Sequence, residues 1–305
     1  MRPEIEKAVL LMRRGGNEAT EQALSLLQNT VFSFSMKVCG QREDAEDTMQ
    51  EVLVKAVPFL PRLDSPKALL VWLYKVAKNR CLMSRRRSKF ASKPDLSLDE
   101  LMPDRKELEG YSAGINPEAF AIRGEEAGQL RAAIQKLPPQ YRIVLVLRDM
   151  ESLTDEEVAE ITGLRPGTVR VRLHRARLFV RKQLMKARSS RPSHTVASVA
   201  SRSGVGALPR PARCRAMFAE LSNYLDERLD DSMCEELEKH IGGCEPCKAF
   251  VSSLEATIDA FRQMPTADPD PARSARLRSE LLSQYQRATN RSVAKARAAR
   301  ANQQR

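Results

Sequence analysis

Apolar residues in the first ninety positions recur at the spacing of amphipathic helices. A helix is predicted over residues 43–56, because apolar side chains at positions 45, 49, 52, 53 and 56 fall on one helical face. Pro58 and Pro61 end this helix. A second helix is predicted over about 67–88, with an inner side formed by Leu69, Leu70, Leu73, Val76, Ala77 and Cys81. The pattern indicates a small helical domain over residues 1–90.

Two stretches poor in apolar residues divide the rest of the chain. Residues 91–117 and 188–213 are rich in small and polar residues and in proline, so both are predicted to be linkers, the second one disordered. Helical patterns return over residues 118–187 and over residues 214–264, called here the C-terminal module. The basic tail, residues 265–305, is expected to be disordered or only partly helical. The predicted fold class is all-α, with three small helical domains.

Charge is strongly segregated along this chain, whose formal net charge is +12. Residues 43–54 carry five acids and no base, whereas residues 72–93 carry eight bases and no acid. Residues 165–188 carry nine bases and no acid. This balance favours a polyanion as partner. There is no apolar run of 18 residues and no secretion signal, so we expect a cytoplasmic protein without a membrane span.

Residues 154–180 have the pattern of a helix-turn-helix. Thr154 and Glu157 form a capping box that starts the first helix, Gly163 supplies the turn, and Pro166 suits the start of the second helix. A buried stripe is predicted at Val169, Leu173, Ala176 and Val180. An arginine-rich helix with an apolar back fits the DNA major groove, where Arg can bind guanine through a forked pair of hydrogen bonds. The alternative is a surface helix made basic for solubility.

The same residues resemble a known family. The stretch LPPQYRIVLVLRDMESLTDEEVAEITGLRPGTVRVRLHRARLFVRKQL resembles region 4 of bacterial sigma factors of the extracytoplasmic-function (ECF) group. The stretches REDAEDTMQEVLVKAVPFL and VWLYKVAKNRCLMSRRR resemble region 2 of that family. The resemblance implies a sigma factor that binds core RNA polymerase and directs transcription initiation at promoters through their −10 and −35 elements.

The resemblance also implies roles for three sets of residues. The polymerase-binding set, called here the acidic face, is Asp44, Glu46, Asp47, Gln50 and Glu51; without the resemblance it would be taken as a solvated surface. The −10 set is Lys75, Lys78, Asn79, Arg80, Arg85, Arg86 and Arg87. The −35 set is Thr168, Arg170, Val171, Arg172, His174, Arg175 and Arg177.

The resemblance further implies that the loop over residues 60–67 holds a flipped −10 base, whose unstacking is offset by binding in a protein pocket. Its sequence, LPRLDSPK, differs from the residues usual in the family, so the base identity stays open. Trp72 beside it could stack on DNA, although a single Trp within LLVWLY is more typical of a core.

His240, Cys244 and Cys247 form a H-x3-C-x2-C pattern in the C-terminal module. Positions 240 and 244 share one face of a helix, and zinc takes four nitrogen or sulfur ligands in a tetrahedron. Cys214 and Cys234 both remain candidates for the fourth ligand. A redox pair and a chance cluster of thiols are alternatives, but no βαβ pattern of a thioredoxin-like fold surrounds the pair.

The C-terminal module resembles the zinc-binding anti-sigma domain. That resemblance favours Cys214 over Cys234 as the fourth ligand and implies one zinc ion per chain, structural or released on thiol oxidation. The module has 11 acids and five bases, so we expect it to dock on the basic sigma regions of the same chain.

Other readings follow from the same residues. A dimeric helix-turn-helix regulator with a structural or redox-sensing zinc domain is the alternative function. A zinc enzyme is disfavoured, because four protein ligands leave no open position on the metal; no catalytic residue is predicted. Cys39 and Cys81 are interpreted as buried small hydrophobic residues, and His194 in the linker has no predicted role.

Overall fold

The computed structural model describes residues 3–62, 65–87, 95–102, 124–189, 212–265 and 267–303. Only the backbone is described at residues 62, 84–87, 124–126, 188–189, 212–216, 245–246 and 291–303. The described residues form helices and contain no strand, which confirms the all-α fold class. The predicted linker over 188–213 lies mostly outside the described residues. None of the described helices combines the length and apolar character that crossing a membrane requires.

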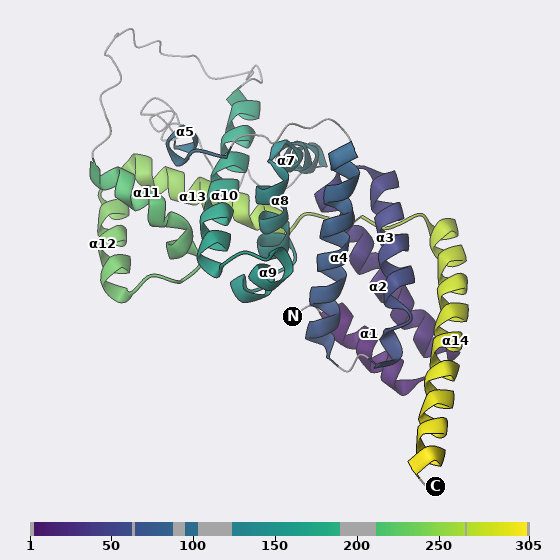
Figure 1. Ribbon diagram of the computed structural model, residues 1–305. Coiled ribbons are helices and arrows are strands. Elements are labelled where there is room, and N and C mark those ends of the chain that lie inside the picture. The colour runs from purple at the N-terminus through teal and green to yellow at the C-terminus, as the bar shows by residue number, and fades with distance from the viewer. Residues whose placement is uncertain are drawn as a thin grey trace. The chain divides into compact units, whose positions relative to one another are not determined.

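The helices fall into two compact units (Figure 1). The first unit comprises residues 1–92, 146–166 and 265–305, and the second comprises residues 93–145 and 167–264. In chain order the elements are α1 (Pro3–Arg14), α2 (Asn17–Cys39), α3 (Arg42–Ala56), the 3-10 helix η1 (Leu60–Arg62), α4 (Pro66–Arg87), α5 (Leu98–Leu101), α7 (Gly124–Lys136), α8 (Pro139–Leu145), the π-helix η3 (Val146–Met150), α9 (Asp155–Thr162), α10 (Pro166–Ser189), α11 (Ala212–Leu225), α12 (Asp231–Gly242), α13 (Glu245–Arg262) and α14 (Pro271–Gln303).

The first unit is built on a bundle of α1 to α4 (Figure 1). The predicted helices over 43–56 and 67–88 are confirmed as α3 and α4. Their apolar faces supply the core together with α2, where the rings of Phe34 and Tyr74 lie 4.7 Å apart. Burial of these side chains is the main favourable term that holds the bundle together.

A buried polar network joins this bundle to the residues after η3. Glu151 is 1% exposed and accepts hydrogen bonds from Lys37 Nζ at 2.7 Å and Tyr74 Oη at 2.6 Å. The network compensates the charge of Glu151, which would otherwise be costly to bury. α9 packs against α4 in the same unit, a contact that the sequence pattern did not predict.

The second unit has a core drawn from distant parts of the sequence. Leu178 of α10 packs with Phe218 of α11 and Phe250 of α13, and the last two rings meet edge to face at 4.7 Å. Leu101 and Met102 also enter this core. Residues 95–102 were predicted as part of a linker, but the apolar pattern around α5 anchors them to the second unit.

The basic tail differs from the sequence-based expectation, because residues 271–303 form one long helix, α14. Asp270 caps its start by accepting from the backbone N–H of Arg273 at 2.8 Å, and Pro271 occupies the first helical position. Ser274, Leu277 and Leu281 are buried at helical spacing. A helix with such an apolar stripe is stabilised chiefly by packing, here against α2, α3 and η1.

Cys39 and Cys81 also differ from expectation. Both side chains are buried, as predicted, but they are joined in a disulfide bond between α2 and α4. Their positions in two facing helices explain the difference, because the Cα atoms come within 5.6 Å, a separation typical of disulfides.

Candidate functional site

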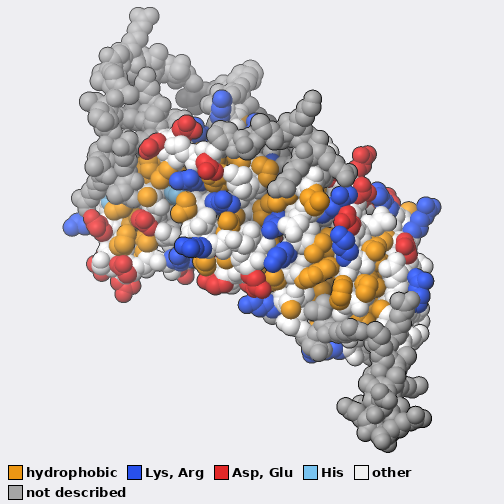
Figure 2. Space-filling model, in the orientation of Figure 1, with side chains coloured by type: hydrophobic (Ala, Val, Ile, Leu, Met, Phe, Trp, Pro, Cys, Tyr) orange, Lys and Arg blue, Asp and Glu red, His pale blue; other side chains and the backbone are white. Residues whose placement is uncertain are grey.

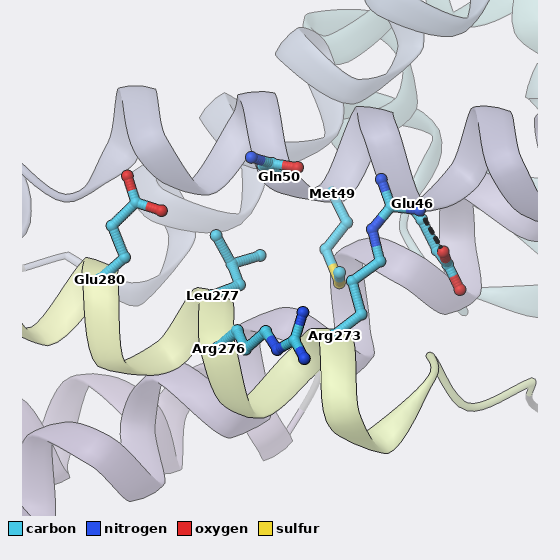
Figure 3. A pocket seen from close by; sticks show the side chains of 7 residues that line it. All are labelled: Glu46, Met49, Gln50, Arg273, Arg276, Leu277 and Glu280. Atoms are coloured by element: carbon cyan, nitrogen blue, oxygen red, sulfur yellow. Dashed lines mark hydrogen bonds and ion pairs between the residues drawn. The ribbon is translucent and has the colours of Figure 1, made fainter.

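The acidic face of α3 is partly covered by α14 (Figure 3). Arg273 donates to Glu46 Oε2 at 2.6 Å and to Asp47 Oδ1 at 2.8 Å. Arg42 donates to the other carboxylate oxygen of Glu46 at 3.0 Å. The Glu46 side chain is therefore only 7% exposed, whereas Asp47 remains exposed.

Further contacts hold α14 on the same surface. A pocket of about 140 Å³ lies between α3 and α14, lined by Met49 and Gln50 on one side and by Leu277 on the other (Figure 3). The buried Gln28 of α2 donates to the backbone oxygen of Ser274 at 3.1 Å and accepts from Arg278 at 3.1 Å. The first turns of α14 therefore combine apolar packing with specific polar contacts.

Another acid of this face, Glu51, lies beside a basic side chain of α4. Arg80 Nε is 2.7 Å from Glu51 Oε2, and Lys55 donates to the other oxygen at 2.8 Å. The hydrogen bond from Lys55 lowers the pKa of Glu51 below its ordinary value, and the charge of Arg80 acts in the same direction. A predicted polymerase contact and a predicted −10 contact thus neutralise one another.

The −10 set does not form one open surface on α4. Lys75 and Asn79 are exposed, but Lys78 is partly buried and donates to the backbone oxygen of Ile161 in α9 at 2.9 Å. Burial lowers the pKa of Lys78 below its ordinary value, and the charge of Lys75 adds to this shift. The side chains of Arg85, Arg86 and Arg87 lie outside the described residues.

The aromatic pair near the predicted base-binding loop is partly open to solvent. Phe59 is 56% exposed, and its ring centre lies 6.5 Å from that of Trp72, which is partly buried. Residues 63 and 64 of the loop lie outside the described residues. The prediction that Trp72 belongs to the core is only partly met.

The helix-turn-helix residues form the predicted local structure. Thr154 and Glu157 make the capping box, and Gly163 adopts a φ of 75°, in the left-handed region that favours glycine. All four residues of the predicted apolar stripe of α10 are buried: Val169, Leu173, Ala176 and Val180. At the start of α10, Thr168, Arg170 and Val171 are exposed.

Two members of the −35 set are buried against the C-terminal module. Arg177 is 0% exposed and donates to both carboxylate oxygens of Asp226, at 2.9 and 3.1 Å. His174 Nδ1 lies 2.7 Å from the hydroxyl of Ser222 in α11. These side chains were predicted to point outward, but the structure turns them toward α11 and the loop that follows it.

Arg181 extends this contact one turn further along α10. Its Nε donates to Ser253 at 2.6 Å, and its guanidinium carbon lies 3.7 Å from the ring centre of Phe250 in α13. Cations over an aromatic face are attracted by the ring, more strongly when water is excluded. Three consecutive turns of α10 therefore contact the C-terminal module.

His174 is strongly perturbed by this environment. Burial, together with the nearby charge of Arg177, lowers the pKa of His174 to about 4. The imidazole is therefore neutral at pH 7 in this arrangement. Exposure of this ring to solvent would return the pKa of His174 toward its ordinary value.

His240, Cys244 and Cys247 converge in the C-terminal module. One ligand atom of each lies within 4.8 Å of the others, and His240 Nε2 is 3.3 Å from Cys247 Sγ. The sequence produces this convergence because Gly243 ends α12, Cys244 caps α13, and Pro246 lies in its first turn. Nitrogen with two sulfurs is a donor set that suits zinc, whose bonds to these atoms are about 2.0–2.3 Å long.

The two candidates for a fourth ligand differ. Cys234 is not part of the cluster among the described side chains, and its Sγ donates to the backbone oxygen of Leu229 at 3.9 Å. The backbone of Cys214 lies in α11, but its side chain is outside the described residues.

Sequence reasoning missed the partners of α10 and α3. Asp226, Ser253 and Arg273 were not singled out, because ion pairs and hydrogen bonds between distant segments leave no local pattern. The sequence did carry a signal for α14, namely Asp270 and Pro271 ahead of leucines at positions 277 and 281, four residues apart.

Acidic side chains gather over α12 on the surface of the C-terminal module (Figure 2). Four exposed acids lie on this helix: Asp231, Glu235, Glu236 and Glu238. This surface would repel DNA.

Three family models match the chain. A model described as Sigma-70 region 2 matches residues 24–90, and one described as Sigma-70, region 4 matches residues 127–180. A model described as a putative zinc-finger matches residues 214–248, a span that begins at Cys214 and includes the metal-ligand cluster.

Two similar proteins and one similar solved structure each cover more than half of the chain. The ECF RNA polymerase sigma factor SigW of Bacillus subtilis is 30% identical over 184 residues, which cover 59% of this chain and 96% of that protein. The RNA polymerase sigma-H factor of Pseudomonas aeruginosa is 29% identical over 186 residues, or 59% of this chain and 93% of that protein. The solved structure of the sigma factor RpoE in complex with the anti-sigma factor NepR from Bartonella quintana is 20% identical, with a TM-score of 0.39, and covers 53% of this chain and 94% of that chain.

Proposed function

Because this chain belongs to the ECF sigma factors, we propose that it carries its own inhibitor, formed by the C-terminal module and α14. Sigma factors bind core RNA polymerase and promoter DNA and are not enzymes. The acidic face of α3 binds polymerase, the −10 set of α4 binds promoter DNA, and the −35 set of α10 reads the second promoter element. The protein acts in the cytoplasm, where polymerase and promoters are found.

The burial of Arg177 is the observation that carries this proposal. A guanidinium whose two forked hydrogen bonds go to Asp226 cannot offer the same bonds to guanine or phosphate. His174 lies one turn away with its ring against Ser222. DNA binding by these side chains therefore requires that the C-terminal module separates from α10.

The contact between α14 and α3 supports inhibition at a second surface. Arg273 binds the two carboxylates, Glu46 and Asp47, that the proposal assigns to polymerase binding. Leu277 and Leu281 add buried apolar area to this contact. Polymerase and α14 therefore compete for the same face of region 2.

Covalent linkage makes even weak docking effective. Residues 190–211 connect α10 to α11, and covalent linkage over so short a stretch gives an effective concentration of about millimolar. The module is acidic by sequence, and α10 is basic, so their attraction adds to the specific contacts and weakens with salt.

Zinc bound by Cys214, His240, Cys244 and Cys247 would hold the inhibitory module together. These ligands come from α11, α12 and the start of α13, and the same α11 and α13 present Ser222 and Ser253 to α10. Closed sites of this kind contribute folding energy directly. Loss of the metal, including loss through thiol oxidation, would therefore free α10.

Binding to core polymerase tests the proposal. Immobilised core enzyme is incubated with the wild-type chain and with the double variant Asp226→Asn, Leu281→Ala, which weakens both docking contacts. We expect tighter binding of the variant, and promoter binding only in the presence of polymerase. Equal binding of both proteins would contradict inhibition, and strong promoter binding by free dimers would favour a conventional regulator.

A further inference from the structure

The disulfide between Cys39 and Cys81 lies inside region 2, and the proposed function does not use it. Cys39 is the last residue of α2, and Cys81 lies in α4. The two residues are 42 positions apart in sequence. Because both are buried in the core of the first unit, neither can pair with a cysteine elsewhere while the bundle is folded.

Three helices meet at this point. The hydroxyl of Thr48 in α3 lies 3.9 Å from Cys81 Sγ, so the sulfur of α4 touches both of its neighbours. Cys81 directly follows Arg80 and lies one turn beyond Lys78, two members of the −10 set. A covalent bond at Cys81 therefore fixes the position of the promoter-binding helix on α2.

The pair lies at the end of α2. Gly40 closes the helix with a φ of 82° and donates its N–H to the backbone oxygen of Met36. The last turn of a helix opens at lower cost than its middle. Because both sulfurs are buried, a small oxidant would reach Cys39 only when this last turn opens, which does not require α4 to move.

We propose that Cys39 and Cys81 form a reversible thiol modification site. Hydrogen peroxide oxidises the pair to a disulfide that joins α4 to α2, and a cellular dithiol reduces it. This inference goes beyond the proposed function, because it concerns region 2 alone and holds whether or not the C-terminal half inhibits.

The chemistry of closure is balanced with peroxide as the oxidant. The thiolate of Cys39 attacks one peroxide oxygen, the O–O bond breaks, and a sulfenic acid and one water form. The thiolate of Cys81 then attacks this sulfur, the S–S bond forms, and the S–O bond breaks to release a second water. The two thiols lose two electrons, which the two peroxide oxygens gain. A dithiol returns two electrons and two protons by thiol–disulfide exchange.

Formation of the disulfide should stabilise region 2 rather than unfold it. Joining residues this far apart restricts the unfolded chain, and the effect grows with the length of the closed loop. Openings of α2 and α4 that separate the two helices should become rarer by on the order of 100-fold.

Peptide mapping tests whether the pair forms. The full-length, zinc-loaded protein is treated with peroxide or with dithiothreitol, alkylated and digested with trypsin. We expect the peptides VCGQR and CLMSR to be linked after peroxide and separate after dithiothreitol. The link should be absent from Cys81→Ala and Cys39→Ala and kept in the control Cys234→Ala. Failure of the wild-type protein to form this link would overturn the proposal.

Hydrogen exchange tests whether the disulfide holds α4 against α2. Peptides from α2 and α4 of the wild-type protein should exchange on the order of 100-fold more slowly in the oxidised form. Cys81→Ala should exchange at the same rate in both conditions. Equal exchange of the linked and reduced wild-type protein would also overturn the proposal, and this comparison decides the matter even if both alanine variants fail to fold.

Discussion

Replacing Asp226 by Asn should weaken the contact between the C-terminal module and α10, and it leaves every residue of the −35 set unchanged. The side chains of Arg177 and Asp226 are 0% and 6% exposed. Breaking so buried a pair costs about 3–5 kcal/mol, since the remaining charge stays in a poorly solvated site. Asn keeps the shape and one acceptor oxygen, so the lower end applies. About 3 kcal/mol corresponds to a shift of roughly 100-fold in the docking equilibrium.

Chemical labelling of arginine measures this shift in the docking equilibrium. Phenylglyoxal reacts with accessible guanidinium groups, and mass spectrometry gives the rate at each site. In the wild-type protein we expect Arg177 to react far more slowly than the exposed Arg170, which serves as an internal reference. In Asp226→Asn the rate at Arg177 should rise by up to roughly 100-fold, toward that of Arg170.

A matched control separates docking from general charge effects. Glu227→Gln removes the same charge from the next residue, whose side chain is exposed, and should leave the labelling of Arg177 unchanged. Zinc content is measured in parallel to show that the module stays folded. If Arg177 stays as protected in Asp226→Asn as in the wild-type protein, with zinc retained, the reasoning about this buried pair is wrong.

Three further predictions concern α14, pH and the metal. Leu281→Ala removes a side chain that is 0% exposed, and should weaken the α14 contact by about 2–4 kcal/mol; polymerase affinity should rise, whereas the exposed Ser279→Ala should have no effect. The pKa of His174 is lowered to about 4 when docked, so undocked protein binds more protons below pH 6.5 and docking weakens as pH falls toward 4. At pH 5 the docking free energy should be weaker by about 2 kcal/mol. Hydrogen exchange of α10, corrected for intrinsic rates, should show this weakening, and His174→Gln should remove the pH dependence. Metal analysis should find about one zinc per chain, lost in Cys244→Ser together with the protection of α10; full protection of α10 without zinc would contradict the role given to the metal.

Local features of the fold could be predicted from the sequence, because they depend on residues close together in the chain. The capping box of Thr154 and Glu157, the turn at Gly163 and the buried stripe of α10 each follow from spacing within one or two helical turns. The convergence of His240, Cys244 and Cys247 is also local, since a helix end and a tight turn bring them together.

Contacts between distant segments could not be predicted in the same way. The pairs of Arg177 with Asp226 and of Arg273 with Glu46 each join charged residues that are far apart in sequence. Many other charged residues of the chain could have formed the same ion pairs. The outward orientation expected for His174 and Arg177 was wrong for this reason, because periodicity gives the apolar back of a helix but not what covers its front. Cys39 and Cys81 were predicted to be buried, but their pairing depends on how α2 faces α4.

Run-off transcription with purified core polymerase tests the central claim most directly, namely that the C-terminal half restrains a sigma factor. At equal concentration, the double variant Asp226→Asn, Leu281→Ala should direct polymerase to start at the cognate promoter much more strongly than the wild-type chain, and removal of zinc should raise the wild-type signal toward that of the variant. Equal transcripts from the wild-type chain and the variant, with and without zinc, would contradict the claim.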